Sequence, residues 1–212
     1  MLDLQDMRSE YIQATLDEST VPIEPFTLFE AWFSQAVETQ IKDPNSMILA
    51  TSSKDNIPNV RTVLLKIFDE KGFVFFTNYN SVKAKEIEEN PHVALEFLWL
   101  DLERQVRVIG TCEKISTSES MSYFMKRSRG SQIGAWVSEQ SSVISSRKML
   151  QMQIEKMKEK FANGSIPLPD FWGGYRVIPS QIEFWQGRAN RLHDRILYRR
   201  QNGGWKIQRL AP

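Results

Sequence analysis

Residues 182–195 read IEFWQGRANRLHDR, and the rest of the chain is organised around this stretch. Strand-forming residues open it, and Gln186-Gly187 signals a turn directly after Trp185. Three arginines, a histidine and an aspartate follow within eight residues, at Arg188, Arg191, His193, Asp194 and Arg195. Arginine forks match phosphate and carboxylate oxygens, and a tryptophan can pack against a planar ring. The stretch predicts either a site for an anionic, ring-bearing ligand or a salt-bridged turn between two C-terminal strands.

The composition is that of an ordinary soluble globular protein, with 41% hydrophobic and 25% charged residues. A net charge of +1 gives no global field that would recruit nucleic acid or a membrane. One cysteine, Cys112, and two distant histidines, His92 and His193, argue against an intramolecular disulfide and a metal site. The chain shows neither a membrane-length apolar run nor a signal-peptide core, so a cytoplasmic location is expected.

Periodicity and turn signals predict an N-terminal arm over residues 1–25 and a single domain over residues 26–212. A capping-box pattern at Thr27–Glu30 predicts a helix from Thr27 to about Lys42. Further helices are expected at 82–89, 116–126, 131–137 and 145–161. Strands are expected at 46–51, 59–68, 73–77, 92–100, 104–115, 174–178 leading to 181–185, 195–200 and 205–210.

This order of elements favours an α+β, mainly antiparallel fold, with a barrel of about six strands and helices outside it. Neither GxGxxG nor GxxxxGK[ST] occurs in the chain. A phosphorylated cofactor would therefore have to be held by side chains.

Several motifs occur in one order along almost the whole chain from about Met7. They are RTVLLK at 61–66, ERQVRVIG at 103–110, SQIGAWVSEQSS at 131–142, PDFWGGYRV at 169–177, and WQGRANRLHDR followed by the terminal WKIQRLAP. Together they resemble the bacterial pyridoxamine (pyridoxine) 5'-phosphate oxidases. The resemblance implies an FMN-binding split β-barrel and a homodimer with FMN sites shared between subunits. It also implies oxidation of pyridoxamine or pyridoxine 5'-phosphate to pyridoxal 5'-phosphate, with O2 reduced to H2O2.

The segment 61–66 places two cations in an otherwise apolar strand, where a charge is costly unless it is paired or binds a ligand. Alternation puts Arg61 and Lys66 on opposite faces, so both could face one ligand only if the strand bulges or twists. The other reading is that one or both cations reach the sheet edge. The resemblance implies that FMN is contacted along this segment, by Arg61, Thr62, Val63, Leu64, Leu65 and Lys66, and that Lys66 also reaches the substrate phosphate.

Lys83 lies in the first turn of a predicted helix, which suits a phosphate but equally suits a solvated lysine. The resemblance implies further FMN contacts from Phe76, Thr77, Lys83, Gln105, Trp185 and Arg195, and from Gln140 and Ser141 of the opposite subunit. Two positions depart from the family pattern, since Val82 stands where an arginine is usual and Phe76 where a tyrosine is commoner.

Tyr123, Arg127 and Ser131 recur at four-residue intervals, which fits either an anion cradle or a charged helix end. The resemblance assigns them, with Lys66, to the substrate phosphate. It also implies that Arg191 and His193 contact the substrate and position its reacting carbon, and that Arg8 and Tyr11 belong to a segment that covers the substrate. Ser9 stands where a second arginine is often seen. A structural role for His193 is the alternative reading.

Two rival functions remain open. One is a flavin oxidase for another planar substrate, such as a phenazine precursor. The other is a non-catalytic module that binds a flavin or pyridoxal phosphate.

Overall fold

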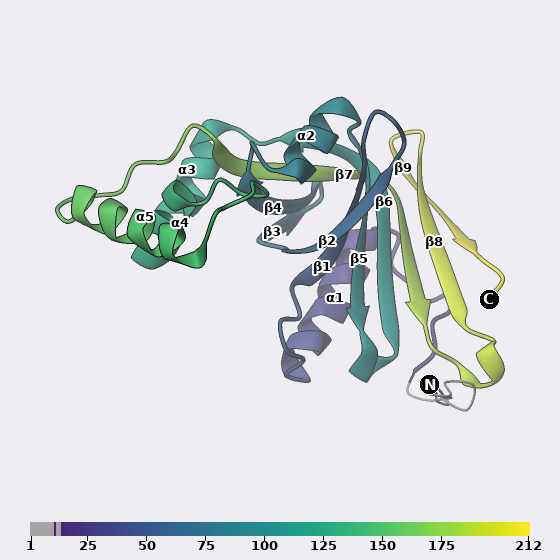
Figure 1. Cartoon of the computed structure of the whole chain (residues 1–212). Helices are drawn as coiled ribbons and strands as arrows, with labels where there is room; N and C mark the ends of the chain where they lie inside the picture. The colour runs from purple at the N-terminus through teal and green to yellow at the C-terminus, as the bar shows by residue number, and fades with distance from the viewer. Residues whose placement is uncertain (1–10, 12–13) are drawn as a thin grey trace, which may run out of the picture. The chain divides into compact units, whose positions relative to one another are not determined.

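The computed structural model describes residue 11 and residues 14–212, which form an antiparallel sheet and five α-helices (Figure 1). The helices are α1 (Pro25–Glu38), α2 (Val82–Glu89), α3 (Thr117–Lys126), α4 (Arg129–Val137) and α5 (Arg147–Lys160), with short 3-10 helices η1 (Leu100–Leu102) and η2 (Ala189–Arg191). The strands are β1 (Ser46–Ser52), β2 (Pro58–Leu64), β3 (Ile67–Asp69), β4 (Gly72–Asn78), β5 (His92–Trp99), β6 (Arg104–Lys114), β7 (Trp172–Gln186), β8 (Asp194–Gln201) and β9 (Gly204–Arg209).

The sheet of the described residues has nine strands rather than the expected six or so. Its order is β2-β1-β5-β6-β7-β4-β3, and β8 pairs with both β7 and β9. The three additional strands are the short β3 and the two strands of the C-terminal hairpin, β8 and β9.

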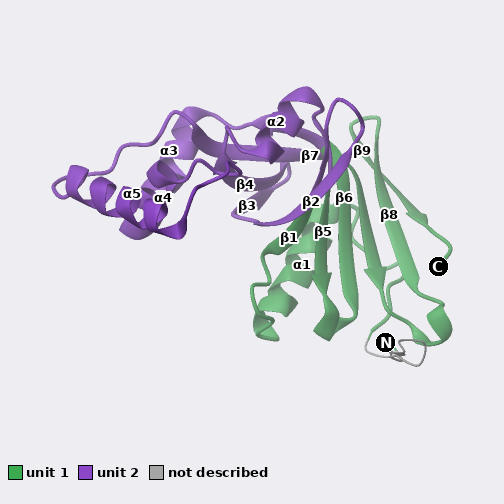
Figure 2. Cartoon of the chain, in the orientation of Figure 1, with its two compact units in different colours: residues 1–49, 94–110, 179–212 green, residues 50–93, 111–178 purple. Residues whose placement is uncertain are grey.

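The chain divides into two compact units (Figure 2). Unit 1 comprises residues 1–49, 94–110 and 179–212, and unit 2 comprises residues 50–93 and 111–178. Four strands, β1, β5, β6 and β7, each begin in one unit and end in the other.

The core of unit 1 is built on the apolar face of α1. Phe29 is fully buried and lies edge-to-face with Phe97 of β5, with ring centroids 5.0 Å apart. Trp32 lies edge-to-face with Phe184 of β7 at 5.2 Å. The expected capping box at Thr27 is wrong, because the helix begins two residues earlier with Pro25 in its first turn. Proline is preorganised for that position and needs no side-chain cap.

The C-terminal strands of unit 1 form a regular ladder. The two strands expected before residue 186 are one continuous strand, β7, whose last residues pair with β8 in the register Gln181↔Arg199 to Gln186↔Asp194. The expected hairpin between β8 and β9 is confirmed, with Gln201 paired to Gly204 across a tight turn. This ladder carries several of the residues that the sequence singles out.

In unit 2, the strand expected over 59–68 is interrupted. β2 ends at Leu64 and β3 begins at Ile67, and the backbone N–H of Lys66 donates to Val74 O at 2.9 Å. The hairpin that follows turns at Gly72, whose φ is +139° and whose added Cβ would lie 2.0 Å from Val177 O. Only glycine fits this turn.

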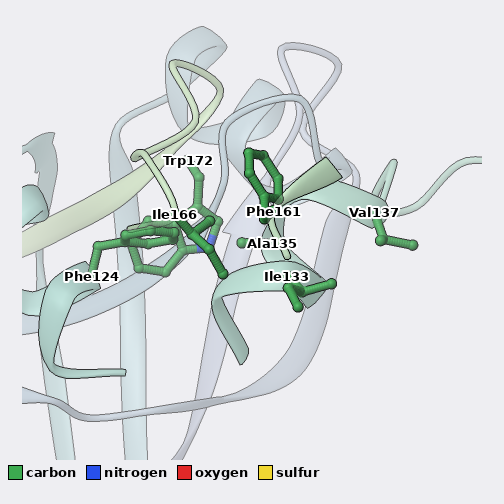
Figure 3. Close-up of a cluster of buried hydrophobic side chains, with 7 residues drawn as sticks. All are labelled: Phe124, Ile133, Ala135, Val137, Phe161, Ile166 and Trp172. Atoms are coloured by element: carbon green, nitrogen blue, oxygen red, sulfur yellow. The ribbon is translucent and has the colours of Figure 1, made fainter. Parts of the chain in front are cut away.

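The helices of unit 2 follow their expected positions closely. α2 has the expected bounds, and α3 begins with the expected capping box, in which Ser116 and Glu119 satisfy each other's backbone N–H groups. A buried cluster packs against α4, α5 and the start of β7 (Figure 3), and its members are Phe124, Ile133, Ala135, Val137, Phe161, Ile166 and Trp172. Leu150, Ile154 and Met157 of α5 pack against this cluster, as their helical spacing predicts.

Candidate functional site

A cavity of about 620 Å³ lies in unit 2. We call it the main cavity. Most of the residues expected at the cofactor or substrate phosphate line it, and they are Arg61, Thr62, Val63, Leu64, Lys66, Phe76, Thr77, Lys83, Tyr123, Arg127, Gln140 and Ser141. Its volume lies within the usual range for sites that bind small molecules and cofactors.

Arg61 and Lys66 both line the main cavity, although strict alternation would separate them. Because β2 ends at Leu64, Lys66 lies outside the regular strand and the alternation no longer applies. Leu65 is the exception in this segment, because its side chain is only 4% exposed and belongs to the core. The interruption between β2 and β3 therefore allows both Arg61 and Lys66 to line the main cavity.

Lys83 is buried at the start of α2 and donates from Nζ to three neutral oxygens. These are Thr77 Oγ1 at 3.2 Å, Gln140 Oε1 at 3.2 Å and Ser81 Oγ at 3.4 Å. The pKa of Lys83 is lowered to about 8, first by burial and then by the charge of Arg61, while the Glu86 carboxylate opposes the change. An anion in the cavity would stabilise the charged ammonium.

Gln140 and Ser141 belong to the main cavity of their own chain. Gln140 Oε1 accepts from Thr77 Oγ1 at 2.8 Å, and Ser141 Oγ accepts the Val82 backbone N–H at 3.3 Å. That they serve the FMN site of the opposite subunit, as the resemblance implies, stays a prediction beside these contacts within their own chain. The loop after α4 folds back onto the N-terminus of α2, which no local sequence signal indicates.

An aromatic stack forms another wall of the main cavity. Phe76 and Tyr123 are stacked, with ring centroids 3.9 Å apart and planes inclined by 17°. The guanidinium of Arg127 lies 4.7 Å from the centroid of the Trp172 ring. Phe76, which stands where the family more often has tyrosine, therefore supplies a ring for stacking but no hydroxyl for a hydrogen bond.

Arg127 is held at the end of α3 and donates from Nη2 to Ser131 O at 3.0 Å. Its Nε is buried and has no hydrogen-bond partner among the described residues. Burial lowers the pKa of Arg127 and raises that of Tyr123. Ser131 lines a second cavity of about 290 Å³, which shares Phe76, Thr77, Arg127 and Gln140 with the main cavity. The expected trio Tyr123, Arg127 and Ser131 is therefore gathered in one region.

These features fit a phosphate-bearing flavin. Arginine and lysine groups match phosphate oxygens, the stacked rings suit a planar system, and the buried ammonium of Lys83 has neutral hydrogen-bond partners that leave its charge for an anion to balance. The donor set therefore agrees with the FMN that the sequence led us to expect.

Unit 1 holds the second group of expected residues. Trp185 and His193 lie 4.5 Å apart between ring centroids, and Tyr11 contacts both edge-to-face at 5.9 and 5.8 Å. Gly187 makes room for Tyr11, because an added Cβ would lie 2.7 Å from its ring. Arg8, the other expected residue of this segment, lies outside the described residues.

The ring of His193 is oriented by the turn itself. The backbone N–H of Arg188 donates to His193 Nδ1 at 3.1 Å, so in the neutral ring the proton is on Nε2. Burial and then the charge of Arg191 lower the pKa of His193. The ring is therefore neutral near pH 7 and offers one N–H donor.

The salt-bridge reading of this stretch holds in part, because Asp194 has an ion-pair partner inside the turn, although among the described residues that partner is neither Arg191 nor Arg195. Asp194 pairs with Arg188 at 3.6 Å and with Arg209 at 2.8 Å. Arg191 is exposed, has a φ of +61°, and forms no ion pair within the part of the chain that the structure describes. An exposed arginine held in the left-handed region is consistent with a ligand-binding role rather than a structural one.

Arg195 and Gln105 complete the expected set in unit 1. Arg195 donates from Nε to the buried carboxylate of Glu183 at 2.7 Å, and from Nη1 to Ala211 O at 2.9 Å. Gln105 is half-buried on β6. Glu183, Glu86, Thr51 and Asn59 support or adjoin expected site residues but were not predicted, because their roles depend on contacts with distant parts of the chain.

No helix among the described residues is long and apolar enough to cross a membrane.

The sequence matches two family models. One, described as "Pyridoxamine 5'-phosphate oxidase", covers residues 33–161, and the other, described as "Pyridoxine 5'-phosphate oxidase C-terminal dimerisation region", covers residues 172–212. A pyridoxine/pyridoxamine 5'-phosphate oxidase of Crocosphaera subtropica is 59% identical over 214 residues, with both chains fully covered. One from Escherichia coli O1:K1 / APEC is 55% identical and covers 97% of this chain and 94% of the relative.

Solved structures show the same fold. PhzG from Burkholderia lata 383, solved in complex with tetrahydrophenazine-1-carboxylic acid, has a TM-score of 0.88 and 26% identity, and the match covers 93% of this chain and 98% of PhzG. A pyridoxamine 5'-phosphate oxidase-related, FMN-binding protein from Nostoc punctiforme has a TM-score of 0.71 at 17% identity, covering 91% and 100% of the two chains. The expected α+β, mainly antiparallel split-barrel fold is confirmed.

Proposed function

Because the chain belongs to the pyridoxamine 5'-phosphate oxidase family, a family of oxidoreductases, we propose that it converts pyridoxamine or pyridoxine 5'-phosphate to pyridoxal 5'-phosphate. O2 is the oxidant and H2O2 the reduced product, and the amine substrate also consumes water and releases ammonia. The observation that carries the proposal is the main cavity, where Arg61, Lys66, Lys83 and Arg127 gather beside stacked aromatic rings.

The cofactor proposed for this reaction is FMN. Arg61 and Lys83 are the residues we assign to its phosphate, because both line the main cavity near the N-terminus of α2. The segment Thr62–Leu64 and Lys66, together with Phe76, Thr77, Gln140 and Ser141, would hold the rest of it. When bound, FMN supplies the two-electron redox chemistry that amino-acid side chains lack.

Arg127, with Tyr123, Ser131 and Lys66, is assigned to the substrate phosphate. The buried, unsatisfied Nε of Arg127 supports this assignment, because a phosphate oxygen would give it a partner. Such a contact discriminates strongly against a substrate without phosphate, because a buried donor then stays unpaired.

Arg191 and His193 are assigned to the substrate ring. His193 presents Nε2–H as a donor, since Nδ1 already accepts the Arg188 N–H. It therefore orients a substrate oxygen or ring nitrogen rather than removing a proton. Tyr11 and Trp185 each contact the His193 ring and shield it from water on those two sides.

The proposed assembly is a homodimer with FMN sites shared between subunits. A C-terminal dimerisation region matches residues 172–212, and this region contains Trp185, Arg191, His193 and Arg195. Residues that would contact cofactor and substrate thus occur in the same segment as the dimerisation region.

Anaerobic titration tests the proposal. The purified protein should be yellow, and its flavin absorbance should bleach on addition of pyridoxamine 5'-phosphate and return when O2 is admitted. Pyridoxamine without phosphate serves as the matched control and should bleach the flavin far more slowly. Protein that binds pyridoxal phosphate without any bleaching would instead be a non-catalytic binding module. Bleaching by dihydrophenazine carboxylates in preference to the phosphorylated amine would instead favour an oxidase for phenazine precursors. The similarity to PhzG is the reason for including this substrate in the test.

Denaturation offers a second check on the cofactor. Cys112 is the one cysteine of the chain, and burial raises its pKa to about 12, so it is a poor nucleophile for a covalent flavin bond. Heat or acid should therefore release all of the flavin into solution. Yellow colour that remained on the denatured chain would contradict non-covalent binding.

A further inference from the structure

Glu86 of α2 is the centre of a hydrogen-bonded group that we call the Glu86 network, consisting of Thr51, Asn59, Arg61 and Glu86. Its carboxylate accepts from Arg61 Nη2 at 3.0 Å, from Asn59 Nδ2 at 3.0 Å and from the Thr51 hydroxyl. The Thr51 oxygen in turn accepts from Arg61 Nη1. The guanidinium is thus held at both Nη atoms, and it cannot rotate without breaking the network.

The Glu86 network stands behind the wall of the main cavity. Arg61 and Asn59 line the cavity, whereas Glu86 and Thr51 are not among its lining residues. The side chains of Arg61 and Glu86 are 18% and 12% exposed, so this ion pair is poorly screened by water. A change at Glu86 therefore acts on a ligand in the cavity only through the residues that Glu86 holds.

Glu86 also lies one helical turn after Lys83. Residues three apart share one side of a helix, so the carboxylate is placed to act on the buried ammonium. The direct hydrogen-bond partners of Lys83 within the described chain are the neutral groups of Thr77, Ser81 and Gln140. Two charges act on Lys83, namely the repulsive one of Arg61 from β2 and the attractive one of Glu86 from α2.

We propose that Glu86 is a positioning residue for cofactor binding, which fixes Arg61 at the cavity wall and offsets its repulsion of Lys83, so that both cations are ready to receive the phosphate of FMN. The inference rests on the proposed function only in naming FMN as the phosphate-bearing ligand. Glu86 itself does not touch the ligand.

The electrostatics give this role a direction that can be measured. Burial raises the pKa of Glu86, but hydrogen bonds from Thr51 and Asn59 and the charge of Arg61 hold it below its usual value, so Glu86 stays ionised. Lys83 has a pKa of about 8, lowered first by burial and then by Arg61. Removing the negative charge of Glu86 leaves both unfavourable effects in place, so the pKa of Lys83 falls further.

FMN affinity is linked to this pKa. A phosphate dianion binds the ammonium form of lysine, and a phosphate monoester is already doubly ionised above about pH 7. Affinity is therefore full below the pKa of Lys83 in the free protein and falls as the pH rises through it. We call this fall the alkaline limb of FMN binding.

The experiment is a fluorescence titration of FMN into flavin-free protein from pH 6.5 to 9.5, with riboflavin, which lacks the phosphate, as the matched ligand. Wild type should show an alkaline limb near pH 8 for FMN and none for riboflavin. In Glu86→Gln the limb should move to lower pH by about one unit, which is a roughly tenfold loss of FMN affinity at pH 9 relative to wild type. In Lys83→Arg the limb should vanish, because guanidinium stays charged, and adding Glu86→Gln should then no longer move any limb.

The outcomes separate positioning from simple structural support. If Glu86 only stabilises the fold, Glu86→Gln lowers the affinity for FMN and riboflavin by the same factor at every pH, and the proposal is overturned. A limb that stays in place in Glu86→Gln, or persists in Lys83→Arg, also overturns it. If Glu86→Gln proves too unstable to titrate, Lys83→Arg still tests the proposal, because the alkaline limb seen in wild type must be absent from this variant.

Failure of the proposed function looks different. A protein that binds FMN with the expected limb but is not bleached by pyridoxamine 5'-phosphate would contradict the oxidase activity and leave the role of Glu86 intact. A protein whose flavin is bleached by pyridoxamine 5'-phosphate but whose FMN affinity shows no alkaline limb would contradict the role of Glu86 and leave the oxidase activity intact.

Discussion

Trp185 and Arg195 are register partners in the β7–β8 ladder, so the two residues lie directly opposite each other although ten positions separate them in the sequence. Two residues further from the turn, Glu183 is paired with Leu197, and its buried carboxylate receives the Arg195 Nε–H at 2.7 Å. Alternation places Glu183, Trp185 and the residues opposite them on one face of this ladder. The hairpin thus presents a ring and a fixed cation together.

Glu183→Gln should destabilise the protein and weaken FMN binding. Glu183 is 3% exposed and pairs with both Arg107 and Arg195, so the change removes two charge-assisted hydrogen bonds from a buried carboxylate. Because both arginines are partly exposed and water can solvate them, we expect a loss of about 1.5–3 kcal/mol in the free energy of unfolding. Urea denaturation at fixed protein concentration measures it. Glu155→Gln, in the exposed pair with Lys158, is the matched control and should change stability by less than about 0.5 kcal/mol.

Arg127→Ala should weaken the phosphorylated substrate far more than FMN. The change removes a half-buried cation whose buried Nε we assign to the substrate phosphate, at a cost on the order of 1.5–3 kcal/mol. The apparent Kd for pyridoxamine 5'-phosphate should rise roughly ten- to hundredfold, while the Kd for pyridoxamine changes little. Lys126→Ala, an exposed neighbour, is the control and should leave both unchanged. Loss of FMN instead of substrate would show that the cofactor and substrate arginines have been assigned the wrong way round.

His193→Ala and Arg191→Ala should lower turnover while flavin content and dimerisation stay intact. For His193 the two amide substitutions are more informative, because the Gln side-chain nitrogen comes near Nε2 and the Asn side chain mimics Nδ1. His193→Gln should therefore keep more turnover per bound flavin than His193→Asn. Equal turnover in both, at the wild-type level, would rule out an orienting role for this ring.

The pH dependence of the same turn follows from the lowered pKa of His193. A protonated ring cannot accept the Arg188 N–H, so the contact is fully present above the unfolded pKa of about 6.5 and is lost as the pH falls through the lower pKa of the folded state. Turnover per bound flavin should be flat from pH 6.5 to 7.5 and decline on the acid side. A maximum on the acid side would mean that the charged ring is the active form.

Val82→Arg should tighten FMN binding. Val82 is 43% exposed, lines the main cavity and stands at the start of α2, beside Lys83. A cation added there gains a charge-assisted contact with phosphate but also meets the positive end of the helix dipole, so the net gain should be about 1 kcal/mol, or roughly fivefold in Kd. The gain should disappear at high salt. Val82→Gln, which is similar in length but uncharged, is the control, and an equal gain from it would exclude a charge effect.

Local patterns predicted the elements whose signals are complete within a few residues. The capping box at Ser116 and Glu119 begins α3 as expected, and α2 has the expected bounds, because side-chain capping and helical spacing act over a single turn. The capping pattern at Thr27 failed because Pro25 offers an equally good helix start two residues earlier. The start at Pro25 also places Pro25 and Phe26 within the helix, where both are buried.

The sequence by itself determined the kinds of groups present: the arginine-rich turn after Trp185, the cations of residues 61–66, and Lys83 at a helix start. Only the tertiary structure decided which of them meet. The end of β2 at Leu64 puts Lys66 in the same cavity as Arg61, and the loop after α4 brings Gln140 to Lys83. Glu86 and Thr51 meet 35 residues apart in the sequence, and no local period encodes that contact. Side-chain chemistry is a property of each residue, whereas proximity, burial and the resulting pKa values arise only when distant segments pack together.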